Sequence, residues 1–131
     1  KTQDQKFFKN ELYSLLEKYL GPIALMSFDL KLISYLSKKL PKIQRGLVLE
    51  RYDYIKKIYS SNDENVITEN QMQKNEISFV SFEYSKLTKE FYNINKTKKR
   101  NVIAWTINSK LKAIKMKNFC DTITFEGFKP L

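Results

Sequence analysis

The residues best suited to chemistry stand where short apolar segments end. VIAWTIN, residues 102–108, starts as a buried strand, reaches the only tryptophan, Trp105, and ends in the polar Thr106 and Asn108. An indole offers a flat apolar wall with one N–H donor, and neighbouring polar groups can orient a ligand. IALMSF, residues 23–28, similarly ends in Ser27 and Phe28. Because no base accompanies Ser27, we expect these residues to bind a ligand and name no catalytic residue.

The absence of histidine narrows the chemistry. Without histidine the chain cannot contain a Ser-His-Asp triad, a His-ligated zinc or a His acid–base pair. Carboxylates lie at the ends of three expected strands, at Glu50, Glu83 and Glu126. Their spacing does not exclude a glycosidase pair, but nothing in the sequence favours one. The single cysteine, Cys120, excludes an internal disulfide and fits a reducing compartment, so we expect a cytoplasmic protein.

The charge indicates an anionic partner, but its composition argues against nucleic acid. The formal net charge is +10, yet only three of the 24 basic residues are arginines. Bidentate recognition of phosphates and bases depends on arginine, whereas dispersed lysines mostly solvate a surface. The one basic cluster, KTKKR at 96–100, is interpreted as a solvated turn, with a phosphate-rich membrane surface as second choice. No apolar run approaches the roughly 20 residues of a membrane span.

Helices and short apolar strands alternate along the chain. Near-continuous apolar strands separated by amphipathic helices predict right-handed βαβ units and a parallel α/β sheet. An open doubly wound sheet and a (β/α) barrel both remain, although no glycine-rich phosphate loop supports a Rossmann or P-loop fold. In a barrel, functional side chains lie at the carboxyl ends of strands. We expect helices over 6–20, 29–40, 83–95 and 109–119, strands over 23–28, 45–50, 77–82, 102–108 and 121–127, and an undecided segment over 51–75.

Two segments of the chain resemble two segments of a known family, in the same order along the sequence. VIAWTIN, a helix and then DTITFEGFKP are similar to the carboxy-terminal end of the glycerophosphodiester phosphodiesterases, where V-x-x-W-T-V-N precedes V-D-G-I-I-T-D-x-P. IALMSFDLKLISYLSKKLPKIQRGLV resembles an earlier Ser-Phe strand, helix and strand of that family. The resemblance implies that residues 1–131 form the second half of a single (β/α)8 TIM barrel domain with parallel strands.

The resemblance also implies an activity. The family hydrolyses glycerophosphodiesters to an alcohol and glycerol 3-phosphate, using two histidines and a divalent metal, here expected to be Mg²⁺ or Ca²⁺, held by carboxylates. Its His-Arg-Gly, Glu-x-Asp and His-Asp motifs are absent from this chain, so the chain alone should be inactive. Lys1 matches the lysine of a Glu-x-Lys motif, whose metal-binding Glu would lie two residues upstream. The family's Thr-Asp is replaced by Phe125-Glu126, and its Gly by Thr122. These departures leave the details of the last βα loop undecided, but not the resemblance itself.

Most of the expected substrate-binding residues keep a structural alternative. They are Lys1, Ser27, Phe28, Trp105, Thr106 and Asn108. Trp105 is assigned as a wall for the glycerol or leaving group, although a strand tryptophan is ordinarily core. Thr106 and Asn108 could instead cap the following helix, and Ser27 could be a structural cap. A terminal lysine such as Lys1 is by default solvated.

Half a barrel requires something to complete it. Open sheet edges and an unfilled interior are aggregation liabilities. We therefore expect as partners a small-molecule phosphodiester and either the missing amino-terminal half of the barrel or a second copy. The alternative function is a non-catalytic module of this fold that binds a phosphorylated ligand or a protein.

Overall fold

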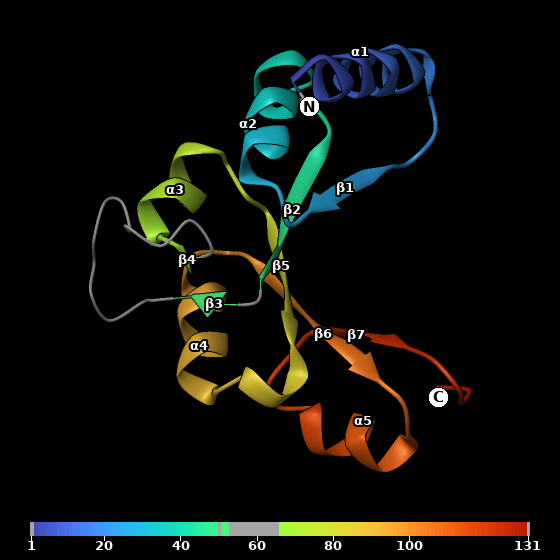
Figure 1. The fold of residues 1–131 in the computed structure, drawn as a ribbon. Coiled ribbons are helices and arrows are strands. Elements are labelled where there is room, and N and C mark those ends of the chain that lie inside the picture. The colour runs from blue at the N-terminus through green and yellow to red at the C-terminus, as the bar shows by residue number, and fades with distance from the viewer. Residues whose placement is uncertain (1, 50, 53–65, 131) are drawn as a thin grey trace.

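The main sheet is parallel and runs in sequence order. The computed structural model describes residues 2–49, 51–52 and 66–130 (Figure 1). Five parallel strands lie in the order β1-β2-β5-β6-β7. A doubly wound sheet would reverse its strand order at a switch point, and this sheet does not. The sheet therefore curls as a half-barrel, and of the two predicted architectures the barrel is confirmed.

The elements largely match the predicted segments. The strands of the main sheet are β1 (Ala24–Ser27), β2 (Gln44–Leu49), β5 (Phe79–Glu83), β6 (Asn101–Ile107) and β7 (Thr122–Phe125). The helices are α1 (Thr2–Lys18), α2 (Leu30–Lys39), α3 (Glu69–Lys74), α4 (Lys89–Thr97) and α5 (Lys110–Met116). No helix of the described part of the chain is long and apolar enough to cross a membrane.

The undecided segment 51–75 contains a small second sheet and a helix. β3 (Arg51–Tyr52) pairs in parallel with β4 (Val66–Ile67), and α3 follows at once. Thr68 begins α3 with a capping box, in which its hydroxyl accepts from the Gln71 amide and the Gln71 side chain accepts from the Thr68 amide. The prediction of one helix over 83–95 was wrong at its start. A 3₁₀ turn, η1 (Tyr84–Lys86), comes first, and α4 starts after the Thr88 cap.

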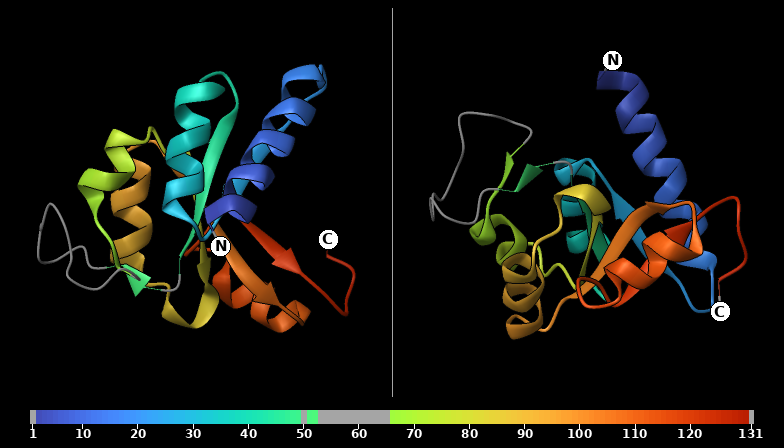
Figure 2. Two further views of the ribbon diagram at one scale, coloured as in Figure 1. Left: turned by 45° about the horizontal axis from the view of Figure 1, so that its top comes forward. Right: turned by 90° about the horizontal axis from the view of Figure 1, so that it is seen from below.

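The hydrophobic core lies between the sheet and its helices. The strand register places Leu47, Val80 and Val102 in one row across the sheet, and Leu49, Phe82 and Ala104 in the next. These rows pack against apolar side chains of the helices that cover this face (Figures 1 and 2), including Ile33, Met72, Phe91 and Met116. The alternation along each strand therefore sends every second side chain to the opposite, inner face of the half-barrel.

Two helices leave much of their apolar face exposed. Of the apolar face of α1, only Leu16 is buried, whereas Phe8, Leu15 and Tyr19 are exposed. In α5, Met116 is buried, but Leu111 and Ile114 are 63% and 68% exposed. The helical period shows which residues share a face, but not whether a neighbour covers that face.

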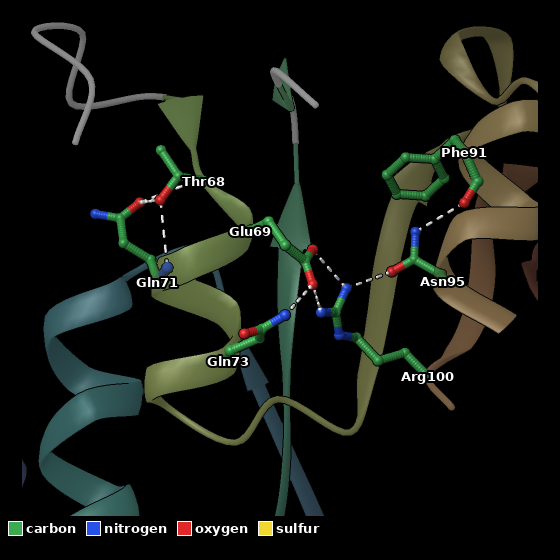
Figure 3. A network of polar contacts seen from close by, with 7 residues as sticks. All are labelled: Thr68, Glu69, Gln71, Gln73, Phe91, Asn95 and Arg100. Carbon is green, nitrogen blue, oxygen red and sulfur yellow. Dashed lines mark hydrogen bonds and ion pairs between the residues drawn. The ribbon is translucent and has the colours of Figure 1, made fainter. Parts of the chain in front are cut away.

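Buried arginines fasten α3 at the amino ends of two strands. Arg100, just before β6, is 3% exposed and donates to Glu69 of α3 and, at 2.9 Å, to Asn95 of α4. Asn95 is fully buried and donates to the Phe91 carbonyl (Figure 3). A buried charge is costly unless it is paired and hydrogen-bonded, as this guanidinium is. This network connects α3, α4 and the start of β6 at the amino-terminal end of the sheet.

Arg45 of β2 does the same at the other end of α3. Its guanidinium, also buried, donates to the carbonyls of Asn75 and Ile43 and to the exposed carboxylate of Glu76. Backbone carbonyls therefore satisfy much of its hydrogen bonding. Residues on the amino-terminal side of barrel strands ordinarily serve stability, and both arginines fit that rule.

Asp121 joins α4, β6 and β7. Its carboxylate accepts from the Val102 amide at 2.7 Å, from Lys96 at 3.1 Å and from the Tyr92 hydroxyl at 3.0 Å. Partial burial by itself raises the pKa of Asp121. The Val102, Lys96 and Tyr92 donors outweigh it and leave the pKa below its ordinary value. The hydrogen bond to Asp121 in turn raises the pKa of Tyr92.

Replacing Asp121 with asparagine is expected to lower the free energy of unfolding near neutral pH by about 1–2 kcal/mol, through loss of charge-assisted hydrogen bonds. Because its folded pKa is lowered, the carboxylate stabilises fully above its unfolded pKa of about 3.9. That contribution disappears as the pH falls through the folded pKa. Urea unfolding of the wild type and Asp121→Asn should therefore differ at neutral pH and converge in acid. A difference that stays constant in acid would contradict this account.

Candidate active-site mouth

The carboxyl ends of the five parallel strands form one rim, where a barrel of this class carries its site. The described residues on or next to this rim include Ser27, Phe28, Glu83, Trp105, Thr106 and Asn108. β1 and β6 are separated by two other strands, yet curling of the sheet brings residues at their ends into contact. The rim is therefore built from segments far apart in sequence.

Trp105 and Phe28 form the aromatic part of this mouth. Trp105 lies in register with Glu83 on the inner face of the sheet, near the end of β6. Its ring meets Phe28 edge to face, with the ring centroids 6.1 Å apart and the planes at 87°. Phe28 is 57% exposed, whereas Trp105 is only partly exposed. The pair presents an apolar wall to the open side of the half-barrel.

The indole also carries an unsatisfied donor. Nε1 of Trp105 is buried and is the one buried side-chain nitrogen or oxygen of the described residues without a hydrogen-bond partner. A buried donor left unpaired costs about 1–3 kcal/mol, so such groups are rare and ask for an explanation. No described residue supplies a hydrogen-bond acceptor to this N–H.

Ser27 has a structural contact. Its Oγ accepts from the Asp29 amide at 3.0 Å, and Asp29 caps α2 by accepting from the amides of Lys31 and Leu32. Ser27 also pairs with Leu47 and so belongs to the helix-facing row of the sheet. Asp29 is therefore the cap of α2, and Ser27, which was expected as a possible structural cap, supports the turn before it.

Thr106 and Asn108 do not cap the next helix. Ser109 caps α5 by accepting from the Lys112 amide at 3.2 Å. The peptide bond between Trp105 and Thr106 is cis, and the pairing of β6 with β7 shifts between Ala104 and Ile107. Thr106 is half-buried and Asn108 exposed. The capping alternative is therefore wrong for these two residues, and both remain on the rim.

The carboxylates of the mouth that the structure describes do not assemble a metal centre. Glu83 accepts from the amide and hydroxyl of Ser85 and so caps η1, while Glu126 is exposed. Lys1 and Glu50 lie outside the described residues. Across the described ranges, no group of three or more His, Cys, Asp or Glu side chains could hold a metal ion. These residues by themselves do not fit the divalent metal that the family resemblance implies.

Sequence reasoning missed some polar contacts near the rim. Lys112 of α5 lies over the Tyr84 ring, with Nζ 5.2 Å from the ring centroid. The two residues come from separate βα units, and no local spacing signals such a pair.

Two open clefts lie beside α1, away from the aromatic pair. One of about 220 Å³ is lined partly by Phe8, Lys9 and Leu32, and the other, of about 470 Å³, is lined partly by Tyr19 and Ile43. Both reflect the loose packing of α1 rather than the aromatic rim.

Comparison with solved structures identifies the fold. A phosphodiesterase from Oleispira antarctica, solved with its product sn-glycerol-3-phosphate, matches with a TM-score of 0.69 and 16% identity over 89% of this chain. The chain has the fold of these phosphodiesterases. A glycerophosphodiester phosphodiesterase from Thermotoga maritima matches with a TM-score of 0.63 and 21% identity over 89% of this chain. One from Galdieria sulphuraria, described as putative, gives 0.66 and 18%, also over 89%.

The likeness covers only part of each phosphodiesterase. The chain spans 44%, 46% and 50% of the Oleispira, Galdieria and Thermotoga chains. This coverage is consistent with a carboxy-terminal half, and it confirms the family resemblance at the level of the fold. No family model matches the sequence, and no curated protein matches it.

Proposed function

We propose that this chain is the carboxy-terminal half of a single barrel domain that hydrolyses glycerophosphodiesters to an alcohol and glycerol 3-phosphate. The observation that carries the proposal is the Trp105 and Phe28 pair at the mouth of a phosphodiesterase fold, with the buried Nε1 of Trp105 left without a partner. An apolar wall that holds one orphaned donor suits a small polar ligand better than it suits a packed core.

The residues of this half would bind and orient the substrate. Trp105 and Phe28 would pack against the glycerol or leaving-group moiety, and the indole N–H would donate to one of its oxygens. Thr106 and Asn108 would supply further polar contacts at the same rim, and Ser27 would support the turn that carries Phe28. Lys1 would offer a cation to the phosphate.

The remaining chemistry would come from outside this chain. The family resemblance implies a histidine acid–base pair and a Mg²⁺ or Ca²⁺ ion held by carboxylates, and this sequence contains no histidine. Such an ion polarises the phosphate when bound. We therefore propose that residues 1–131 are catalytically silent alone and act within a completed, cytoplasmic barrel.

Glycerophosphocholine with Mg²⁺ or Ca²⁺ is the test substrate. We expect release of glycerol 3-phosphate by the protein isolated with whatever polypeptide completes its barrel, and none by residues 1–131 alone. Product would be measured in a coupled assay, with a metal-chelated sample as control. Binding of glycerophosphocholine without turnover by the completed protein would favour the non-catalytic module, and turnover by residues 1–131 alone would overturn the division of labour.

A further inference from the structure

One carboxylate of the mouth lies beside the aromatic wall. Glu83 is the last residue of β5, and its Cα pairs with that of Trp105 on β6. Both residues belong to the inner face of the sheet, because Phe82 and Ala104, one position earlier, belong to the core row. Neighbouring strands lie about 4.8 Å apart, and β5 and β6 are neighbours in the sheet (Figure 1). Glu83 and Trp105 therefore share one small part of the mouth.

No cation of the described chain neutralises this carboxylate. Glu83 is half-buried and is the one charged residue among the paired strand positions of the inner face. The chain has a formal net charge of +10, yet no basic side chain of the described ranges forms an ion pair with Glu83. Lys112, in the next loop along the rim, lies over the Tyr84 ring.

The structural role of Glu83 leaves it able to bind a ligand. Its oxygens accept from the amide and the hydroxyl of Ser85, and these contacts cap η1. A carboxylate has about four acceptor positions, so these two hydrogen bonds do not exhaust it. Capping requires an acceptor but no charge, since uncharged asparagine and serine are equally good caps. The negative charge of Glu83 is therefore not explained by the turn that it stabilises.

The rings next to Glu83 suit a cationic ligand. Trp105 is partly exposed, and Phe28 meets it edge to face. An ammonium group is attracted to the face of an aromatic ring, most strongly to that of tryptophan, and aromatic cages are the usual binding sites of quaternary ammonium groups. A carboxylate beside such rings adds the counter-charge. Rings alone accept any apolar group, whereas rings with a carboxylate favour a cation that carries apolar substituents.

We propose that Glu83, Trp105 and Phe28 bind a positively charged leaving group, so that the mouth selects glycerophosphodiesters of amino alcohols such as choline. This inference rests on the proposed function for its reaction. Glu83 is the specificity-determining residue, because its charge attracts the ammonium group while the rings cover the methyl or methylene groups around it. A neutral leaving group such as glycerol gains nothing from this charge, and an anionic leaving group is repelled by it.

Binding of choline alone tests the proposal. The protein with its completed barrel is titrated by calorimetry with choline and with dimethylbutanol, the neutral isostere of choline, and we expect the isostere to bind about tenfold more weakly. Glu83→Gln keeps an acceptor for Ser85 but removes the charge. It should weaken choline binding about tenfold and leave the urea midpoint and the binding of dimethylbutanol unchanged. Glu126→Gln removes the same charge from an exposed position after β7 and should leave choline binding unchanged.

Kinetics supply a second measurement. Glu83→Gln should lower kcat/KM about tenfold for glycerophosphocholine and leave kcat/KM for glycerophosphoglycerol unchanged. An equal loss for both substrates would overturn the proposal, because Glu83 would then act on the phosphate or on the fold. Absence of choline binding, equal binding of the neutral isostere, or an equal effect of Glu126→Gln would overturn it as well. The choline titration needs no turnover, so it separates a failure of this proposal from a failure of the proposed phosphodiesterase activity.

Discussion

Replacing Glu69 with alanine is expected to lower the free energy of unfolding by about 2–4 kcal/mol, because it leaves a buried guanidinium without its counter-charge. Arg100 is almost fully buried, and its remaining side-chain acceptor would be Asn95. The Glu69 side chain is 22% exposed, so water can reach part of the site and the loss should stay below that of a fully enclosed pair. The measurement is the urea midpoint, with the slope of the transition as a check on two-state unfolding.

The chain offers a matched control for this variant. Glu76 forms the corresponding ion pair with Arg45, but its side chain is 76% exposed, and the Arg45 guanidinium keeps the carbonyls of Asn75 and Ile43. Glu76→Ala should therefore cost less than about 1 kcal/mol, as exposed ion pairs do. Equal losses for Glu69→Ala and Glu76→Ala would show that the burial of Arg100 does not govern the effect.

Replacing Trp105 with alanine in the completed enzyme is expected to lower kcat/KM for glycerophosphocholine about 100-fold, equivalent to about 2.7 kcal/mol of lost transition-state binding. The substitution removes both the wall that meets Phe28 and the N–H donor. Trp105→Phe keeps a ring and removes only the donor, so we expect a loss of about tenfold, in line with one hydrogen bond. Steady-state kinetics of both variants separate the two contributions.

The control for Trp105 lies on the next strand. Phe125 pairs with Ile107 of the hydrophobic core, near the rim but on the helix-facing side of β7, and is 47% exposed. Phe125→Ala should therefore leave kcat/KM unchanged. A loss for Phe125→Ala as large as that for Trp105→Ala would mean that the aromatic wall does not face the substrate. Unchanged kinetics in Trp105→Phe would remove the donor from the proposed site.

The local patterns predicted most of the elements, and they failed where a distant contact decides. Apolar runs of strand length separated by helical periods gave β1, β2, β5, β6 and β7 close to their observed bounds. The start of α4 was misplaced because Thr88 provides a cap that interrupts the apolar pattern after Glu83. Segment 51–75 resisted prediction because, among its described residues, two strands of two residues each pair with one another outside the main sheet.

For the candidate site, the sequence located the rim but not its contacts. The change from apolar to polar residues around Trp105 marks a strand end, and this position could be predicted from the sequence alone. That Phe28 meets Trp105 depends on the curling of a whole sheet between them. The assignment of the helix cap to Ser109 rather than Asn108 depends on one backbone turn, since all three polar residues of this loop are acceptable caps by type.

The sequence by itself therefore determined the βα alternation, the parallel sheet and the aromatic strand end, because periodicity and side-chain type act over a few residues. Only the tertiary structure decided that Arg45 and Arg100 are buried and that Leu111 and Ile114 are exposed. Burial depends on which surfaces meet across the fold. Neither the lysine-rich composition nor an apolar stripe on a helix shows which part of the fold packs against a given side chain.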